Sequence, residues 1–142
     1  MCELKTFITE SRRQTVRAVD FAQVQTCWGV GRYIVEYEQK GADRAKYGTK
    51  LVPKLSEKLT VDFGQGFDIS NLHKMRLFYL TFPIVDALRP QLNWTHYRKL
   101  IRIEDPKARE WYIQEAITQN WSSRALERQI NRLYYERLLS SR

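Results

Sequence analysis

Apolar residues recur at steps of three and four along almost the whole chain, which is the spacing of one face of an α-helix. Alternating apolar and polar positions, the mark of half-buried strands, do not persist beyond a few residues. We therefore expect an all-α fold, a helical bundle in a single domain over residues 1–142. The pattern favours a long N-terminal helix and one or two helix-turn-helix-like units.

The first expected helix runs from about residue 9 to residue 40, with Gly41 ending it. Its apolar stripe is formed by Val16, Val19, Ala22 or Gln23, Thr26, Val30, Tyr33 and Tyr37. Gly29 and Gly31 fall within this helix. Because glycine has no side chain to hold neighbours apart, they indicate close helix packing or a bend.

Further helices are expected over residues 47–63, 71–82, 95–103, 106–119 and 123–138. Pro53 places the first turn of its helix nearby, or kinks the helix. Side chains suited to capping precede the later helices: Ser70, Asn93, Asp105 and Ser122. Two helix-turn-helix-like units result, over residues of about 47–82 and 95–138.

Composition limits the class of protein. A chain of 142 residues with 43% apolar content can build its own core, and its apolar runs are too short to cross a membrane. The N-terminus lacks a signal-peptide pattern, and two cysteines are too few for a disulfide framework. We expect a cytoplasmic protein that does not bind membranes.

Basic residues are clustered. The net charge is +8, and residues 87–103 contain Arg89, Arg98, Lys99 and Arg102 but no acid. Residues 121–142 contain five arginines against Glu127 and Glu136. Clustered cations favour a polyanionic partner through counterion release, although charge alone does not distinguish this from an ordinary solvated basic surface.

The last expected helix has two contrasting faces. At about 100° per residue, Leu126, Ile130, Leu133 and Arg137 share one sector. The opposite face carries Arg124, Arg128, Asn131, Arg132 and Tyr135. The turn before it contains Asn120, which tolerates left-handed backbone, and Trp121, which can pack the helix onto the core.

Such an arrangement suits a helix-turn-helix, whose second helix enters the DNA major groove with its N-terminal residues nearest the bases. We predict groove and phosphate contacts from Ser122, Ser123, Arg124, Arg128, Asn131 and Arg132. The alternative is an amphipathic bundle helix whose arginines only face water.

Two other segments add candidate contacts. In the helix over 95–103, Tyr97, Leu100 and Ile101 form the inner face, and the backbone clamps would be Thr95, Arg98, Lys99 and Arg102. Secondary candidates begin the helix over 71–82: Asn71, His73, Lys74 and Arg76. That helix is apolar almost all round, which favours a core position.

Catalytic patterns are weak. Glu38-Gln39-Lys40 matches a nuclease triplet but ends a helix and has no strand-borne Asp before it. His73 and His96 have no partners at zinc-ligand spacing, and Gly64-Gln65-Gly66 lacks the residues of a phosphate loop. We expect no metal, no cofactor and no catalytic activity in this chain.

Several ordered segments resemble the N-terminal domain of the YhcG family of bacterial proteins, from about Trp28 to Leu138. They include residues 63–67 (FGQGF), 71–79 (NLHKMRLFY), 92–97 (LNWTHY) and 121–130 (WSSRALERQI). The resemblance implies a helical DNA-binding module that targets a C-terminal PD-(D/E)xK nuclease domain. The sequence stops where that second domain would start, so no catalytic residue is carried over.

The expected function is thus that of a non-catalytic targeting domain that binds nucleic acid, with double-stranded DNA as the favoured partner. The alternative is a protein-interaction or dimerisation module that uses the long N-terminal helix. In that case the face with Trp28, Tyr33 and Tyr37 would pair with a partner helix or with a second copy.

Overall fold

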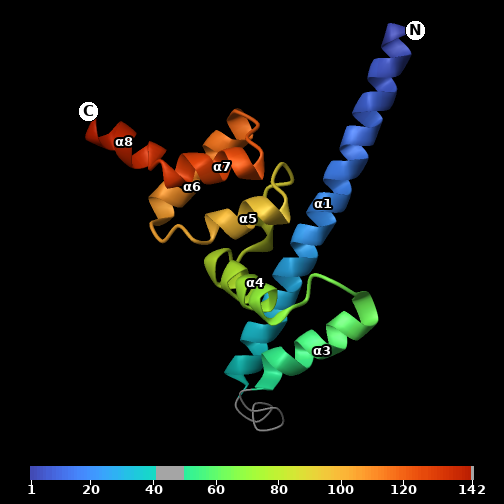
Figure 1. Ribbon diagram of the computed structural model, residues 1–142, viewed down its shortest axis with the longest axis vertical. Helices are drawn as coiled ribbons and strands as arrows, with labels where there is room; N and C mark the ends of the chain where they lie inside the picture. Colours follow the sequence, from blue (N-terminus) through green and yellow to red (C-terminus); the bar gives the residue numbers. More distant parts are fainter. Residues whose placement is uncertain (41–49, 142) are drawn as a thin grey trace. The chain divides into compact units, whose positions relative to one another are not determined.

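A computed structural model describes residues 1–40 and 50–141. These residues form helices joined by turns and irregular segments, and they include no β-strand. The all-α prediction is confirmed. The α-helices are α1 (Cys2–Gln39), α3 (Leu51–Phe63), α4 (Ile69–Thr81), α5 (Trp94–Leu100), α6 (Pro106–Thr118), α7 (Ser123–Asn131) and α8 (Tyr134–Ser140), and a 3-10 turn, η2, spans Val85–Ala87 (Figure 1). None of these helices is long and apolar enough to cross a membrane.

The chain divides into two compact units, Gln25–Leu88 and Met1–Val24 with Arg89–Arg142. In the first unit, α4 packs against the second half of α1 and against α3. A Cβ atom placed on Gly31 would overlap the carbonyl oxygen of Met75. Close packing at Gly31 is confirmed, whereas Gly29 has open space around it and α1 continues through both glycines.

The buried face of α1 differs from the predicted stripe. Val16, Val19 and Tyr33 are exposed. The buried side chains are instead Val24, Cys27, Trp28, Ile34 and Val35. α1 begins at Cys2, not near residue 9, and the expected end at Gly41 lies outside the described residues. Several stripes of this helix are apolar enough to be buried, and packing against α4 decides which one is.

Trp28 is engaged within its own unit. Its Nε1 donates a hydrogen bond to the carbonyl oxygen of Phe82 at 2.7 Å, and its ring meets that of Tyr79 edge-on at 5.3 Å between centroids. The proposed partner-binding face with Trp28, Tyr33 and Tyr37 is therefore covered at Trp28 by the chain itself.

The start of α4 corrects a second prediction. Asp68, not Ser70, is the capping residue: its backbone is extended and its carboxylate accepts a hydrogen bond from the Asn71 amide. Ser70 already lies inside the helix. Aspartate and serine are equally good caps, so the choice between them depends on where the preceding turn ends. The described part of the preceding helix, α3, starts at Leu51 with Pro53 in its first turn.

In the second unit, α5, α6, α7 and α8 pack on one another (Figure 1). Tyr97, Leu100, Tyr112 and Leu126 are almost fully buried there. The caps predicted at Asn93, Asp105 and Ser122 are confirmed, each accepting a hydrogen bond from a backbone amide of the helix it begins. α5 ends at Leu100, and Ile101 is buried as predicted.

The prediction of a single helix over residues 123–138 is wrong, because the helix is interrupted after α7 and a separate helix, α8, follows. Leu133 has a left-handed backbone (φ 54°), and its side chain is 56% exposed instead of facing the core. The break lets α8 turn back onto α6. There the Tyr112 hydroxyl accepts a hydrogen bond from the Tyr135 amide and donates one to Glu136.

Candidate nucleic-acid interface

The turn between α6 and α7 has a fixed conformation. Asn120 adopts the left-handed backbone that its side chain tolerates, with φ 53°. The Trp121 amide donates to the carbonyl oxygen of Ala116 at 2.9 Å. Ser122 then begins α7, and its Oγ accepts a hydrogen bond from the Ala125 amide at 3.1 Å. The first residues of α7 are thereby held by backbone geometry as well as by packing.

His96 holds this turn from α5. Its Nε2 lies 2.8 Å from the Trp121 carbonyl oxygen, which can only accept, so Nε2 donates. Its Nδ1 lies 3.1 Å from the backbone amide of Asn93, as part of the capping box of α5. The ring is 7% exposed. A surface or capping role was predicted for His96. Its hydrogen bond to Trp121, 25 residues along the chain, could not be predicted from any local sequence pattern.

α7 presents the predicted arginine face to solvent. Leu126, fully buried, fixes the rotation of the helix. Arg124, Arg128, Asn131 and Arg132 are exposed, and Ser123 is half-buried. Tyr135 does not extend this face, because it belongs to α8 and its amide bonds to Tyr112. The exposed row is therefore shorter than the helical wheel indicated, ending at Arg132.

A small hollow of 160 Å³ lies between α7 and the C-terminal end of α5 with the residues that follow it. It is lined by Lys99, Arg102, Ile103, Glu127, Ile130 and Asn131. Residues from two faces predicted separately thus line the same hollow: Lys99 on α5, Arg102 in the turn after α5, and Asn131 on α7. The Lys99 ammonium pairs with the Glu127 carboxylate at 3.1 Å, so part of its charge is already balanced.

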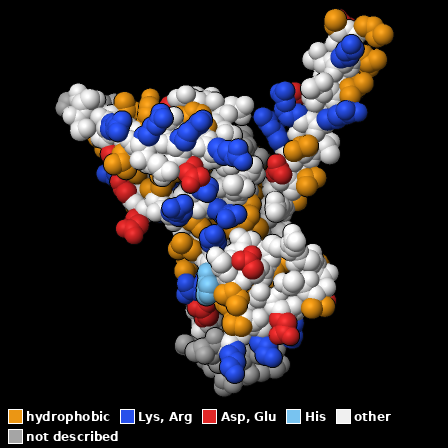
Figure 2. Space-filling view, viewed as in Figure 1, with side chains coloured by type: hydrophobic (Ala, Val, Ile, Leu, Met, Phe, Trp, Pro, Cys, Tyr) orange, Lys and Arg blue, Asp and Glu red, His pale blue; other side chains and the backbone are white. Residues whose placement is uncertain are grey.

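The remaining clamp candidates differ in exposure. Thr95 and Arg102 are exposed, while Arg98 is half-buried. In the described part of the chain, the Nε atom of Arg98 is buried without a hydrogen-bond partner. Figure 2 shows Lys and Arg side chains gathered over the C-terminal helices, with an acidic side chain among them.

Two of the four secondary candidates on α4, Asn71 and Arg76, are engaged within the chain. The Arg76 guanidinium donates two hydrogen bonds to the Glu38 carboxylate, at 2.8 and 2.9 Å, and these bonds raise the pKa of Arg76. The Asn71 side chain donates to the carbonyl oxygen of Gly66. His73 is exposed and Lys74 is half-buried.

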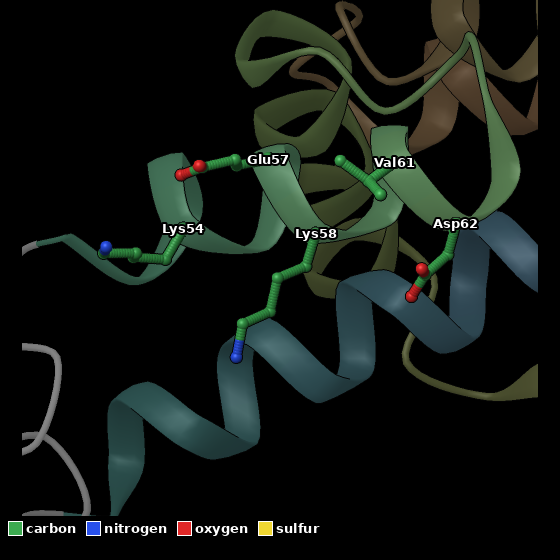
Figure 3. A pocket seen from close by; sticks show the side chains of 5 residues that line it. All are labelled: Lys54, Glu57, Lys58, Val61 and Asp62. Atoms are coloured by element: carbon green, nitrogen blue, oxygen red, sulfur yellow. The ribbon is translucent and has the colours of Figure 1, made fainter.

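The nuclease-like triplet at the end of α1 is engaged within the chain. The Glu38 carboxylate of this triplet pairs with Arg76, and no group of three His, Cys, Asp or Glu side chains in the described part of the chain could hold a metal ion. A shallow hollow of 260 Å³ on α3 is lined by Lys54, Glu57, Lys58, Val61 and Asp62 (Figure 3). All five side chains come from one helix, and they include no nucleophile with an adjacent base.

Comparison with known proteins identifies the family. Residues 3–137 match the model of the DUF1016 N-terminal domain. The chain belongs to the DUF1016 N-terminal domain family. It is also 34% identical, over 166 aligned positions, to an Escherichia coli K12 protein named "Putative nuclease YhcG".

The alignment to this relative covers 94% of the chain but 44% of the relative, so the chain spans less than half of the relative's length. The predicted resemblance to YhcG proteins is confirmed. No solved structure matches the chain.

Proposed function

We propose that this DUF1016 N-terminal domain binds double-stranded DNA through α7 and serves as the non-catalytic targeting part of a nuclease-type protein. The observation that carries the proposal is the exposed row on α7, with Arg124, Arg128 and Arg132 on one surface above the buried Leu126. Arginine donates two parallel hydrogen bonds to a phosphate or to a guanine edge, so such a row suits both backbone and base contacts.

The cap of α7 supports this assignment. In helix-turn-helix proteins the N-terminal residues of the second helix lie nearest the bases, and a helix N-terminus attracts phosphate. Ser122 accepts a bond from the Ala125 amide, which leaves its hydroxyl hydrogen able to donate to a phosphate oxygen. The His96 bond to Trp121 holds this end in place.

Residues of α5 and of the turn that follows it extend the proposed surface. Arg102 is exposed and lies at the same hollow as Asn131, so it is the stronger candidate for a phosphate clamp. Lys99 contributes less, because Glu127 balances its charge. We assign Thr95 and Arg98 to the edge of this surface. The name of the E. coli relative supports a role beside a nuclease.

Charge reversal tests the proposal. The variant Arg124→Glu/Arg128→Glu removes two neighbouring cations of α7. The matched control is Lys54→Glu/Lys58→Glu, which reverses two exposed cations at the same spacing on α3 (Figure 3). Each double reversal changes the net charge by the same amount, so any difference between them reports position rather than total charge.

Binding of a labelled random-sequence duplex is measured by fluorescence anisotropy at low salt. We expect the α7 variant to lose at least about a hundredfold in affinity, since two phosphate contacts become repulsions, while the α3 control stays near the wild type. An equal loss in both variants would mean diffuse attraction to a basic protein. Absence of binding in the wild type would refute the proposal.

A further inference from the structure

A second hollow, here called the turn cleft, lies beside the turn between α6 and α7, within the unit formed by Met1–Val24 and Arg89–Arg142. Its volume is 540 Å³, whereas the hollow at Arg102 has 160 Å³. Clefts that hold small molecules have volumes of about 300–1,000 Å³, so the turn cleft has room for a ligand of that size. Its polar and aromatic lining consists of Arg17, Gln91, His96, Asn120, Trp121 and Ser122.

The turn cleft carries a positive charge that is not balanced. Arg17 is exposed on α1, and no carboxylate of the described residues forms an ion pair with its guanidinium. None of the described residues that line the cleft is acidic. The Ser122 hydroxyl accepts a hydrogen bond from the Ala125 amide, so its own hydrogen remains able to donate. A guanidinium and a hydroxyl donor without a neighbouring carboxylate suit a phosphate group.

Two amide side chains also line the turn cleft. Gln91 precedes α5, and Asn120 lies in the turn with its backbone fixed in the left-handed region. Neither amide group forms a hydrogen bond with the side chains or backbone of the described residues. An amide presents a donor beside an acceptor, and this pair matches the N7 acceptor and N6 donor of adenine. The cleft can therefore recognise the edge of a nucleobase as well as a phosphate.

Trp121 adds an aromatic ring that is held in position. Its indole is half-buried and meets the Tyr134 ring edge-on, with 6.4 Å between the centroids. His96 fixes the backbone here, because its Nε2 donates to the Trp121 carbonyl oxygen at 2.8 Å and its Nδ1 accepts from the Asn93 amide at 3.1 Å. A planar base can stack on such a ring. Because these groups are ordered before a ligand binds, little further ordering is required.

We propose that the turn cleft binds a single adenine nucleotide. The phosphate would lie beside Arg17 and Ser122. The base would stack on Trp121 and form hydrogen bonds with the amides of Gln91 and Asn120. A free nucleotide and an unpaired nucleotide turned out of a DNA strand present this same chemistry. Binding of a free nucleotide is independent of α7, whereas capture of a strand nucleotide rests on the proposed binding of DNA.

Isothermal titration of the full chain with adenosine monophosphate tests the free nucleotide. Adenosine, which lacks the phosphate, is titrated in parallel and should bind at least about tenfold more weakly. Arg17→Gln should weaken binding of the monophosphate about tenfold and leave binding of adenosine unchanged. Arg12→Gln removes an exposed cation from the same helix outside the cleft and should bind as the wild type does. Circular dichroism checks that the variants are folded.

A labelled duplex with one unpaired adenine tests the strand nucleotide, beside the fully paired duplex at the same salt concentration. Fluorescence anisotropy should show that the wild type prefers the unpaired adenine by at least about tenfold. Asn120→Gly removes an amide without straining the left-handed backbone, and Gln91→Ala removes the other. Both should reduce this preference and leave binding of the paired duplex unchanged.

The two titrations separate the sources of the nucleotide. Binding of adenosine monophosphate alone would assign the turn cleft to a free nucleotide, and a preference for the unpaired adenine alone would assign it to a DNA strand. The proposal is overturned if neither is observed, or if Arg17→Gln and Asn120→Gly bind both probes as the wild type does. Loss of all duplex binding would instead refute DNA binding by α7, and the titration with the monophosphate would still decide whether the cleft holds a nucleotide.

Discussion

At Gly31 the backbone of α1 lies close to the backbone of α4. We predict that Gly31→Ala destabilises the protein by about 1–3 kcal/mol, because its new Cβ would overlap the Met75 carbonyl and both helices would have to shift. Gly29→Ala is the control. It has open space and should stabilise the helix by about 0.5–1 kcal/mol. Urea unfolding measures both, and a stabilising Gly31→Ala would contradict the packing described here.

The conformation of a single residue could be predicted where the residue type itself favours that conformation. Asn120 stood out because asparagine tolerates left-handed backbone, and the structure places it there with φ 53°. His96 was expected at a surface or a cap, but its bond to Trp121 was not foreseen. That contact depends on how α5 packs against the turn, and no local pattern encodes it.

At the scale of elements, the interruption between α7 and α8 was not predicted from the sequence. Leucine favours helices, so the run from Arg132 to Tyr135 read as continuous. The structure places Leu133 in left-handed backbone, which costs a leucine about 1 kcal/mol. The bonds of Tyr112 to Tyr135 and Glu136, and the contacts of the Trp111 ring with Tyr134 and Tyr135, offset this cost.

The sign of one substitution tests the break. We predict that Leu133→Gly stabilises the protein by about 0.5–1 kcal/mol, because glycine adopts positive φ without a steric penalty and the lost side chain is exposed. In a continuous helix the same change would destabilise by about 1 kcal/mol. Thermal unfolding distinguishes an interrupted helix, in which Leu133→Gly raises Tm, from a continuous one, in which it lowers Tm. Leu138→Gly, inside α8, is the control and should lower Tm.

The hydrogen bonds of Tyr112 that join α6 to α8 make the free energy of unfolding depend on pH. Burial raises the pKa of Tyr112 to about 12, against about 10 for an unfolded tyrosine. The folded state therefore holds this proton more tightly, so the stabilisation is complete below about pH 10 and is lost as the pH rises through about 12.

Tyr112→Phe should lower the free energy of unfolding by about 1 kcal/mol at pH 8, since two hydrogen bonds are lost. It should also flatten the decline in stability between pH 10 and pH 12. Tyr33→Phe, at an exposed tyrosine, serves as the control. Urea unfolding at both ends of this pH range provides the measurement. If stability fell equally between pH 10 and pH 12 in Tyr112→Phe and in the wild type, the proposed contribution of the Tyr112 hydroxyl would be contradicted.

Across the whole molecule, the sequence predicted the helical class, the family and three helix caps, because these depend on periodicity and local chemistry. It misassigned the buried face of α1, where several stripes were apolar enough to be buried and α4 determined which one was. For the candidate interface, the wheel of α7 placed Arg124, Arg128 and Arg132 on one side of Leu126, and all three are exposed. The proximity of Lys99, Arg102 and Asn131 required the packing of α5 on α7.

The measurement that tests DNA binding by α7 most directly is the salt dependence of duplex affinity in a neutralising variant. For each phosphate contact that is lost, the slope of log K against log salt concentration falls by about 0.9. Arg124→Gln/Arg128→Gln should therefore flatten the slope by about two, and Lys54→Gln/Lys58→Gln should leave it unchanged. Equal slopes in the wild type and both variants would contradict a phosphate-contacting face on α7.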